Sequence, residues 1–433
     1  MKGAFTLKSR QLKKYFMSSV AAALLLAGIG VPAGKAPSAS AAAAQSAAAP
    51  AILLDGYHLP FPAPPVVKSG TTMVPFRAVA EALHITVQWD AKARTITATK
   101  AANGGQTRKV VLKQGSKQAS VDGRAVALAI APYAQNGSVL VPLSFFSSQF
   151  GATVSWNGAT KTVSIQSPAE DLYTSVFYAL NSFAKRSYMP LFDGVSFGWT
   201  RIGEDGKVIL DGKDYYWPEA AGDITPESLV EGAEPAGQDA QLMVVGTDGK
   251  GELTRLLGDP SLRASAITDI VSLASDKHFT GITLDFEGLG LTGDAQVVQQ
   301  SLNTFVKDIA AAAHQAGLKL SLALHPLNGS YKGYDYKTLG SYADELIIMA
   351  YDFKQESGPE PLSSIDTAIK LALQQVDKSK LVLGISLGSE NAQSLRGPVG
   401  LAKRYDLKGI AIWRLTLVSD DIVNALKQNV ILN

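Results

Sequence analysis

The chain has 433 residues, of which 46% are hydrophobic, no cysteine and a formal net charge of +2. This length exceeds one ordinary domain, so it predicts two folded units behind a targeting segment. The lack of cysteine excludes disulfides, thiolate metal sites and a lipid-modified cysteine anchor. Residues 1–41 hold six basic residues and no acidic one, so the remaining chain carries a net charge of −4. That mildly acidic remainder lacks the basic footprint of a nucleic-acid-binding protein.

The first residues have the pattern of an export signal. Basic residues between Lys2 and Lys14 precede an apolar run from Met17 to about Val31, and small residues follow. This pattern predicts a secretory signal peptide over residues 1–41 and a linker over 42–51. The apolar run is short for a bilayer, so we expect cleavage near Ala41 and no membrane span afterwards. Export without disulfides indicates a bacterial protein, of a Gram-positive organism, that is secreted or held at the cell wall.

Residues 52–167 contain an internal repeat at an offset of 67 residues. TTMVPFRAVAEALHITVQWDAKARTITAT aligns with GSVLVPLSFFSSQFGATVSWNGATKTVSIQ, which pairs Pro75 with Pro142 and Trp89 with Trp156. Each copy predicts a strand ending at Val-Pro, a short helix, and strands around the tryptophan, so the region is a small duplicated α+β domain. We expect both tryptophans to fill its core; the alternative is a platform on which sugars stack.

The repeated VP, helix and VxW pattern resembles the copper amine oxidase N-terminal-like domain. This family is a stalk module of secreted and surface proteins in spore-forming bacteria. The resemblance implies a spacer or a cell-wall attachment module without catalysis of its own. Although the family name refers to copper, only His58 and His84 lie in the region, too few for a typical copper site.

From residue 170 to residue 433, eight apolar runs alternate with helical periodicity. Ahead of the fourth run, Ile267, Ile270, Val271 and Ala274 repeat at helical spacing, which predicts a helix packed on the strands. Eight strand-helix units in this length predict an α/β domain of the (β/α)8 TIM barrel type. The predicted strands are 174–180, 194–200, 240–247, 279–287, 318–326, 344–352, 380–388 and 408–415.

The fourth run, FTGITLDFE, ends in two carboxylates spaced two residues apart. Because side chains alternate along a strand, Thr283, Asp285 and Glu287 share one face. Each carboxylate raises the cost of ionising its neighbour, so one of them can stay protonated near neutral pH as a general acid must. In a TIM barrel, active sites lie at the carboxyl ends of the strands, where this pair is expected.

Three runs resemble glycoside hydrolase family 18. GITLDFE is similar to the family's D-G-x-D-x-D-x-E signature, MAYD (349–352) to its M-x-Y-D, and IAIW (410–413) to the tryptophan of its last strand. The segment DELIIMAYD (344–352) most resembles the branch of the family that holds spore-cortex-lytic enzymes, related cell-wall glucosaminidases and chitinase-like proteins.

The resemblance implies a role for each matching residue. Glu287 would protonate the glycosidic oxygen, and Asp285 would orient the substrate's 2-acetamido group, whose carbonyl attacks the anomeric carbon with retention. Tyr351 would bind the acetamido oxygen as the third catalytic residue. Asp352 would support this network, and Trp413 would form the floor of the sugar subsite by stacking on the sugar ring. The alternative for Tyr351 and Trp413 is packing inside the barrel.

The resemblance also places Met349 and Thr283 among the substrate-binding residues. The chain departs from the family at its first two aspartates, which correspond to Thr280 and Thr283. The Thr283 hydroxyl can donate a hydrogen bond to Asp285 but cannot exchange a proton with it. The seventh run, LGISLGSE, lacks an aromatic residue that we expect after its first glycine. These departures allow reduced or lost activity.

The sequence therefore predicts a secreted glycosidase that cleaves β-linked N-acetylglucosamine-containing polysaccharide in peptidoglycan, spore cortex or chitin. The alternatives are a catalytically silent sugar-binding barrel and a structural wall protein acting through its stalk. We expect no cofactor and no metal, because His278, His314 and His325 are scattered and no HxH or HExxH motif occurs. His325 and Pro326 end the fifth run, where a cleft position for His325 and a packed or solvent-facing one are equally compatible with the sequence.

Overall fold

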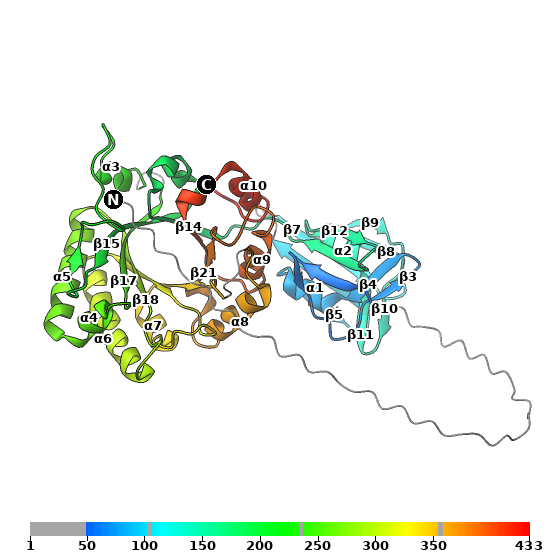
Figure 1. The fold of residues 1–433 in the computed structure, drawn as a ribbon. Coiled ribbons are helices and arrows are strands. Elements are labelled where there is room, and N and C mark those ends of the chain that lie inside the picture. Colours follow the sequence, from blue (N-terminus) through cyan, green and yellow to red (C-terminus); the bar gives the residue numbers. More distant parts are fainter. Residues whose placement is uncertain (1–48, 102–105, 234–236, 354–357) are drawn as a thin grey trace, which may run out of the picture. The chain divides into compact units, whose positions relative to one another are not determined.

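The computed structural model describes residues 49–101, 106–233, 237–353 and 358–433 (Figure 1). The predicted signal peptide and most of the predicted linker lie outside these residues. Within the described ranges, no helix has both the length and the apolar character needed to cross a bilayer.

The N-terminal domain consists of three antiparallel or mixed sheets and two short helices. The strand orders are β12-β13-β1-β2, β10-β11-β4-β3 and β5-β6-β7-β8-β9. The helices are α1 (Phe76–Ala82) and α2 (Leu143–Gln149). The strands are β1 (Ala51–Leu54), β2 (Tyr57–His58), β3 (Val66–Lys68), β4 (Thr71–Pro75), β5 (Thr86–Asp90), β6 (Thr95–Ala101), β7 (Thr107–Lys113), β8 (Gln118–Val121), β9 (Arg124–Ala127), β10 (Tyr133–Gln135), β11 (Ser138–Pro142), β12 (Thr153–Asn157) and β13 (Thr162–Gln166).

The duplication is visible in the elements themselves. β4, α1, β5 and β6 recur as β11, α2, β12 and β13, and each pair begins 67 residues apart. β4 and β11 lie side by side and antiparallel, with Val74 opposite Val141. Each of these strands ends in a proline, Pro75 or Pro142, whose fixed φ suits the residue that precedes a helix. The predicted duplicated α+β domain is confirmed.

The two equivalent tryptophans differ in burial. Trp89 is partly buried and packs against the domain core, and Phe76 and Val139 lie around it. Trp156 is 53% exposed, so the expectation that it fills the core is wrong. Both residues lie on edge strands, and an edge strand buries a side chain only where another element covers it.

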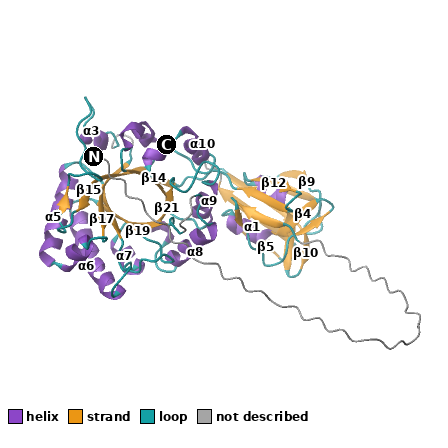
Figure 2. Ribbon diagram, viewed as in Figure 1, coloured by secondary structure: helices purple, strands orange, loops and turns teal. Residues whose placement is uncertain are grey.

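The C-terminal domain is a closed barrel of eight parallel strands, as predicted (Figure 2). The order β14-β22-β21-β20-β19-β18-β17-β15 closes through pairing of β14 with β15, and a short hairpin strand, β16 (Val208–Ile209), extends β15. The barrel strands are β14 (Tyr173–Tyr178), β15 (Gly194–Ile202), β17 (Asp239–Thr247), β18 (Gly281–Glu287), β19 (Lys319–Leu324), β20 (Glu345–Met349), β21 (Leu381–Ser386) and β22 (Gly409–Trp413).

Helices surround this ring of strands in Figure 2. They are α3 (Pro226–Glu231), α4 (Glu252–Gly258), α5 (Pro260–Asp276), α6 (Ala295–Gln315), α7 (Tyr336–Tyr342), α8 (Leu362–Leu373), α9 (Arg396–Arg404) and α10 (Asp420–Lys427), with 3-10 helices η1 (Ser182–Leu191), η3 (Lys378–Lys380) and η4 (Leu415–Leu417). The predicted helix before the fourth strand is α5, where Ile270 and Ala274 are fully buried and Ile267 and Val271 are partly buried.

The barrel buries its strands on both faces. One large cluster packs between the strands and the helices, whereas a smaller inner cluster fills the barrel interior. The inner cluster contains inward-facing residues of six strands, namely Phe177, Met243, Val245, Ala323, Ile347, Met349, Val382 and Ala411. The interior is therefore a packed core, and a ligand can enter only at an end of the barrel.

Candidate active site

β18 places the two carboxylates at the barrel mouth. Ile282, Leu284 and Phe286 face the helices, and the Phe286 ring lies 5.6 Å from the ring of Phe305 on α6. Because side chains alternate along the strand, Asp285 and Glu287 point to the interior side and toward the carboxyl end. Burial of the outer face thus fixes the register that presents the acids.

A pocket of about 270 Å³ opens at this end of the barrel. It is lined by six of the seven residues that the sequence singled out, and the family resemblance was the signal that found them. These six are Asp285, Glu287, Met349, Tyr351, Asp352 and Trp413. They come from β18, β20, β22 and the residues that follow β20, so the fold assembles them from distant parts of the chain.

The two acids of β18 have different environments. Asp285 is 2% exposed, and its Oδ1 is buried without a hydrogen-bond partner among the described residues. Burial, and then the charge of Glu287, raise the pKa of Asp285 well above its usual value. The Glu287 side chain is 40% exposed, and burial followed by the charge of Asp352 raises the pKa of this carboxyl too. A protonated carboxyl at the pocket surface can serve as a proton donor.

Tyr351 and Asp352 lie just beyond the end of β20. Tyr351 is half-buried against the inner cluster, and burial together with the charges of Asp285 and Glu287 raises the pKa of its hydroxyl, which stays a donor. Asp352 is exposed and has a left-handed backbone with φ of 59°. Its N–H donates to Oε1 of the buried Glu360 at 3.0 Å, which holds this turn.

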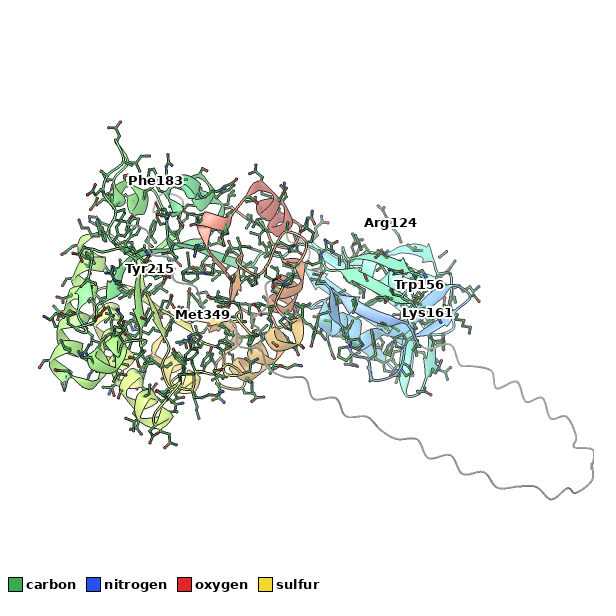
Figure 3. The ribbon with its side chains drawn as sticks, viewed as in Figure 1. Arg124, Trp156, Lys161, Phe183, Tyr215 and Met349 are labelled. Atoms are coloured by element: carbon green, nitrogen blue, oxygen red, sulfur yellow. The ribbon has the colours of Figure 1, made fainter. Side chains whose placement is uncertain are left out.

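Trp413 and Met349 form an apolar side of the pocket. The Trp413 ring is half-buried and packs edge-on against Phe177 at 5.3 Å. Met349 is 4% exposed and belongs to the inner cluster while it borders the pocket, and Figure 3 labels it over the ring of strands. Packing inside the barrel and a position at the pocket are thus both true of these residues.

Thr283 does not line the pocket, which corrects its predicted place among the substrate-binding residues. It is fully buried one step deeper along β18, and its hydroxyl donates to Oε1 of Gln241 at 2.6 Å. The Ser196 hydroxyl lies 3.0 Å from the hydroxyl oxygen of Thr283. Thr283 does not donate the hydrogen bond to Asp285 that its hydroxyl could make, because the single hydroxyl proton is directed to Gln241.

Sequence reasoning left two contributors to the site undecided or unnoticed. His325, which follows β19, lines the pocket and stacks on Tyr331 with ring centroids 4.1 Å apart. Tyr215 comes from the loop after β16 and packs against the inner cluster beside Tyr351, and burial plus the charges of the two β18 acids raise its pKa. Only the position of His325 at a strand end could have pointed to it; the loop carrying Tyr215 shows no periodic signal.

Two further pockets lie at the same end of the barrel, beside Tyr215. One, of about 260 Å³, is lined by Tyr215, Phe183 and Tyr216, and the other, of about 450 Å³, shares Phe183 and Tyr216 with it. Figure 3 labels Phe183 and Tyr215 along one side of the barrel domain. Tyr216 is 42% exposed, so an aromatic surface continues outward from the acids.

Within the described ranges, no group of three or more histidine, aspartate or glutamate side chains has an arrangement that could hold a metal ion. The pocket contains three carboxylates, two on β18 and one after β20. Asp285 is buried with a raised pKa, which disfavours the ionised form that a cation needs.

A closed (β/α)8 barrel with two carboxylates at the carboxyl end of one strand is typical of TIM-barrel enzymes that use acid catalysis. Sequence comparison then gives the family. The model described as "Glycosyl hydrolases family 18" matches residues 155–400, more than half of the chain, so the chain belongs to this family. The "Copper amine oxidase N-terminal domain" model matches residues 53–165, as the repeat predicted. The family 18 match ends before β22, so the assignment of Trp413 depends on its place in the fold.

Curated relatives align with a limited part of the chain. The cortical fragment-lytic enzyme of Bacillus subtilis (strain 168) is 27% identical over 142 residues, which is 30% of this chain and 32% of that protein. The enzyme of the same name from Bacillus anthracis is 24% identical over 175 residues, 35% of this chain and 39% of the relative. The alignment thus spans about a third of the length of these relatives.

Solved structures share the fold. The spore cortex-lytic enzyme SleL of Bacillus cereus superposes with a TM-score of 0.50 at 16% identity, covering 61% of this chain and 76% of SleL. The C-terminal domain of the "putative chitinase" from Desulfitobacterium hafniense DCB-2 superposes with a TM-score of 0.52 at 18% identity, covering 60% of this chain and 99% of that domain. At such identities the likeness establishes the barrel fold alone.

Proposed function

We propose that the chain is a glycosidase that cleaves N-acetylglucosamine-containing polysaccharide with Glu287 as the general acid. The observation that carries this proposal is the pocket-facing Glu287 carboxyl, whose pKa is raised beside the buried Asp285. Membership of family 18 supports it, because glycosidases of this family use the substrate's own acetamido group as the nucleophile and need one carboxylic acid.

The other pocket residues fit the same reaction. The buried Oδ1 of Asp285 lacks a hydrogen-bond partner among the described residues, so an acetamido N–H can supply one. The Tyr351 hydroxyl can donate to the acetamido oxygen, Asp352 adds negative charge near Glu287, and Trp413 offers an aromatic face to the sugar. Glu287 would protonate the departing glycosidic oxygen while the acetamido oxygen attacks the anomeric carbon.

The substrate we propose is a polymer, either peptidoglycan of the wall or cortex, or chitin. The aromatic pockets that continue past Tyr215 and Tyr216 give room for neighbouring sugars. Curated relatives are named as cortical fragment-lytic enzymes, which supports a substrate in the cell wall or cortex. We also propose that the chain is exported, on the basis of its N-terminal basic and apolar segments, and that the stalk domain holds it at the wall.

The test is hydrolysis of muramyl and chitin oligosaccharides by the wild-type chain, Glu287→Gln, and Glu227→Gln as a matched control. Glu227 pairs with Lys277 on the outside of the barrel, so its loss should leave activity unchanged. Glu287→Gln should retain binding and lose cleavage. Binding without cleavage by the wild-type chain would refute the enzyme and favour a silent sugar-binding barrel, for which the replacement of the family's aspartate by Thr283 is the supporting observation.

Localisation is tested separately. Fractionation of the source cells should recover a shortened chain from the medium or wall, and purified wall should retain the full-length Glu287→Gln chain. Recovery of uncleaved protein in the cytoplasm would refute export.

A further inference from the structure

His325 is held rigidly beside the acid. Its ring stacks on Tyr331 at 4.1 Å with an interplanar angle of 26°, and the Tyr334 ring lies 5.8 Å away. The Tyr336 hydroxyl donates to the main-chain carbonyl of His325 at 3.0 Å. The imidazole can therefore rotate little, because both its ring and its backbone are fixed by neighbours.

The free nitrogen of this ring faces Glu287. Nε2 of His325 lies 3.7 Å from Oε2 of Glu287 and has no hydrogen-bond partner among the described residues. This separation is too long for a hydrogen bond, but the Glu287 side chain is 40% exposed and can move toward a fixed donor. Contacts of catalytic groups are often long in ligand-free sites and tighten when substrate binds.

The protonation state of His325 is compatible with donation from its Nε2 to Glu287. Burial lowers the pKa of His325 to about 4, so at neutral pH the ring is uncharged and carries one N–H. The titratable groups that face Glu287 from the surrounding elements are Asp285 on β18, His325 after β19, Tyr351 and Asp352 after β20, Tyr334 and Tyr215. The two neighbouring carboxylates disfavour a charged Glu287, and Thr283 cannot relieve this because its hydroxyl bonds Gln241.

We propose that His325 is a positioning residue for Glu287. In this proposal the Nε2–H of His325 donates to the Glu287 carboxylate oxygen that is left when the acid gives up its proton. The C–O bond to the leaving sugar breaks, the glycosidic oxygen takes the proton from Glu287, and the histidine keeps its own proton throughout. The uncharged ring of His325 would thus stabilise the charged form of Glu287. Position 283 holds a threonine in this chain, and its hydroxyl is bonded to Gln241. The inference rests on the proposed glycosidase function.

Two substitutions separate the donor from the packing. His325→Phe keeps an aromatic ring against Tyr331 without an N–H, and His325→Gln keeps an N–H donor without the ring. Loss of a hydrogen bond to a charged group should lower kcat about 10- to 100-fold in His325→Phe and leave KM close to wild type. The basic limb of the kcat/KM pH profile should move up by about one pH unit, because Glu287 becomes a weaker acid. His325→Gln should restore part of the lost kcat and reverse part of the shift in the pH profile.

A readout that needs no turnover keeps this inference separate from the proposed function. The ring nitrogens of His325 are followed by NMR in the full chain and in Glu287→Gln, and assigned by the signal lost in His325→Gln. We expect the Nε2–H tautomer at neutral pH and a change in the Nε2 shift when Glu287 is replaced. An Nδ1–H tautomer, ring signals indifferent to Glu287, or an unmoved pH profile in His325→Phe would overturn the inference, whereas an inactive wild-type chain would overturn only the glycosidase.

Discussion

The hydroxyl of Thr283 donates to Oε1 of Gln241 at 2.6 Å and so is directed away from Asp285, its neighbour on the same face of β18. The residue at the position of a family aspartate is therefore part of the barrel's buried polar network with Ser196 and Gln241. Asp285 is left with Glu287 as the charged group that affects its pKa. The chemistry of the pocket consequently depends on fewer carboxylates than the family pattern contains.

Thr283→Val should lower stability more than activity. The change leaves the buried oxygens of Gln241 and Ser196 without their partner, which costs about 1–3 kcal/mol. Activity should fall by less than about threefold at a temperature where the variant is folded, since the lost hydroxyl does not reach the acids. Denaturant unfolding and turnover measure the two effects, with Thr283→Ser as the control. A large loss of turnover with unchanged unfolding would mean that the hydroxyl acts on Asp285.

Asp285→Asn should stabilise the chain at neutral pH while it abolishes cleavage. The folded-state pKa of Asp285 is raised, so above the unfolded pKa of about 3.9 the folded chain holds a proton that the unfolded chain releases. Stability from this group therefore falls as pH rises toward the folded pKa. The variant's advantage in melting temperature should be larger at pH 8 than at pH 4. A variant that melts below wild type at pH 8 would contradict the raised pKa.

His325 should make the chain less stable in mild acid. Its folded pKa of about 4 is below the unfolded value, so between these limits the unfolded chain binds a proton that the folded chain excludes. The contribution is present above about pH 6.5 and is lost as pH falls, by about 2 kcal/mol between pH 8 and pH 5. Denaturant unfolding of His325→Phe should show a smaller loss than wild type over this range. Equal losses would show that the imidazole is solvated.

Gly384→Ala should disturb Tyr351. A Cβ at Gly384 on β21 would lie 2.9 Å from the Ile348 carbonyl oxygen and 3.3 Å from Cε1 of Tyr351. Because the backbone oxygen cannot yield easily, the tyrosine must shift, and we expect about 10- to 100-fold lower kcat. Gly249→Ala serves as control, since nothing lies within 4 Å of its added Cβ. Unchanged turnover in Gly384→Ala would show that the position of Tyr351 is not critical.

The two stalk tryptophans should respond differently to truncation. Trp89→Ala removes a ring that packs on the core and should destabilise the N-terminal domain by about 2–4 kcal/mol. Trp156→Ala removes a ring that is 53% exposed and should cost less than about 1 kcal/mol. Proteolysis of this domain across a denaturant series would measure both. Equal destabilisation would indicate that Trp156 is covered by another part of the chain in solution.

Much of the barrel could be predicted because its signals are local. Eight apolar runs between helical segments specify strands that are buried on both faces, and such strands close with helices outside. The alternation of side chains on β18 was also readable, so the shared face of Asp285 and Glu287 followed from the strand period. The repeat at an offset of 67 residues likewise predicted β4, α1, β5 and β6 and their counterparts β11, α2, β12 and β13 in the N-terminal domain.

The tertiary structure alone decided which polar groups meet. Thr283 faces inward as expected, but its partner is Gln241 of the neighbouring strand, and the sequence contains no sign of that choice. His325 and Tyr215 reach the acids from a strand end and a loop, through contacts between residues far apart in the chain. The exposure of Trp156 was also hidden from the repeat, because burial depends on what covers an edge strand. Local periodicity determines elements and their faces, whereas pairing, burial and pKa depend on three-dimensional neighbours.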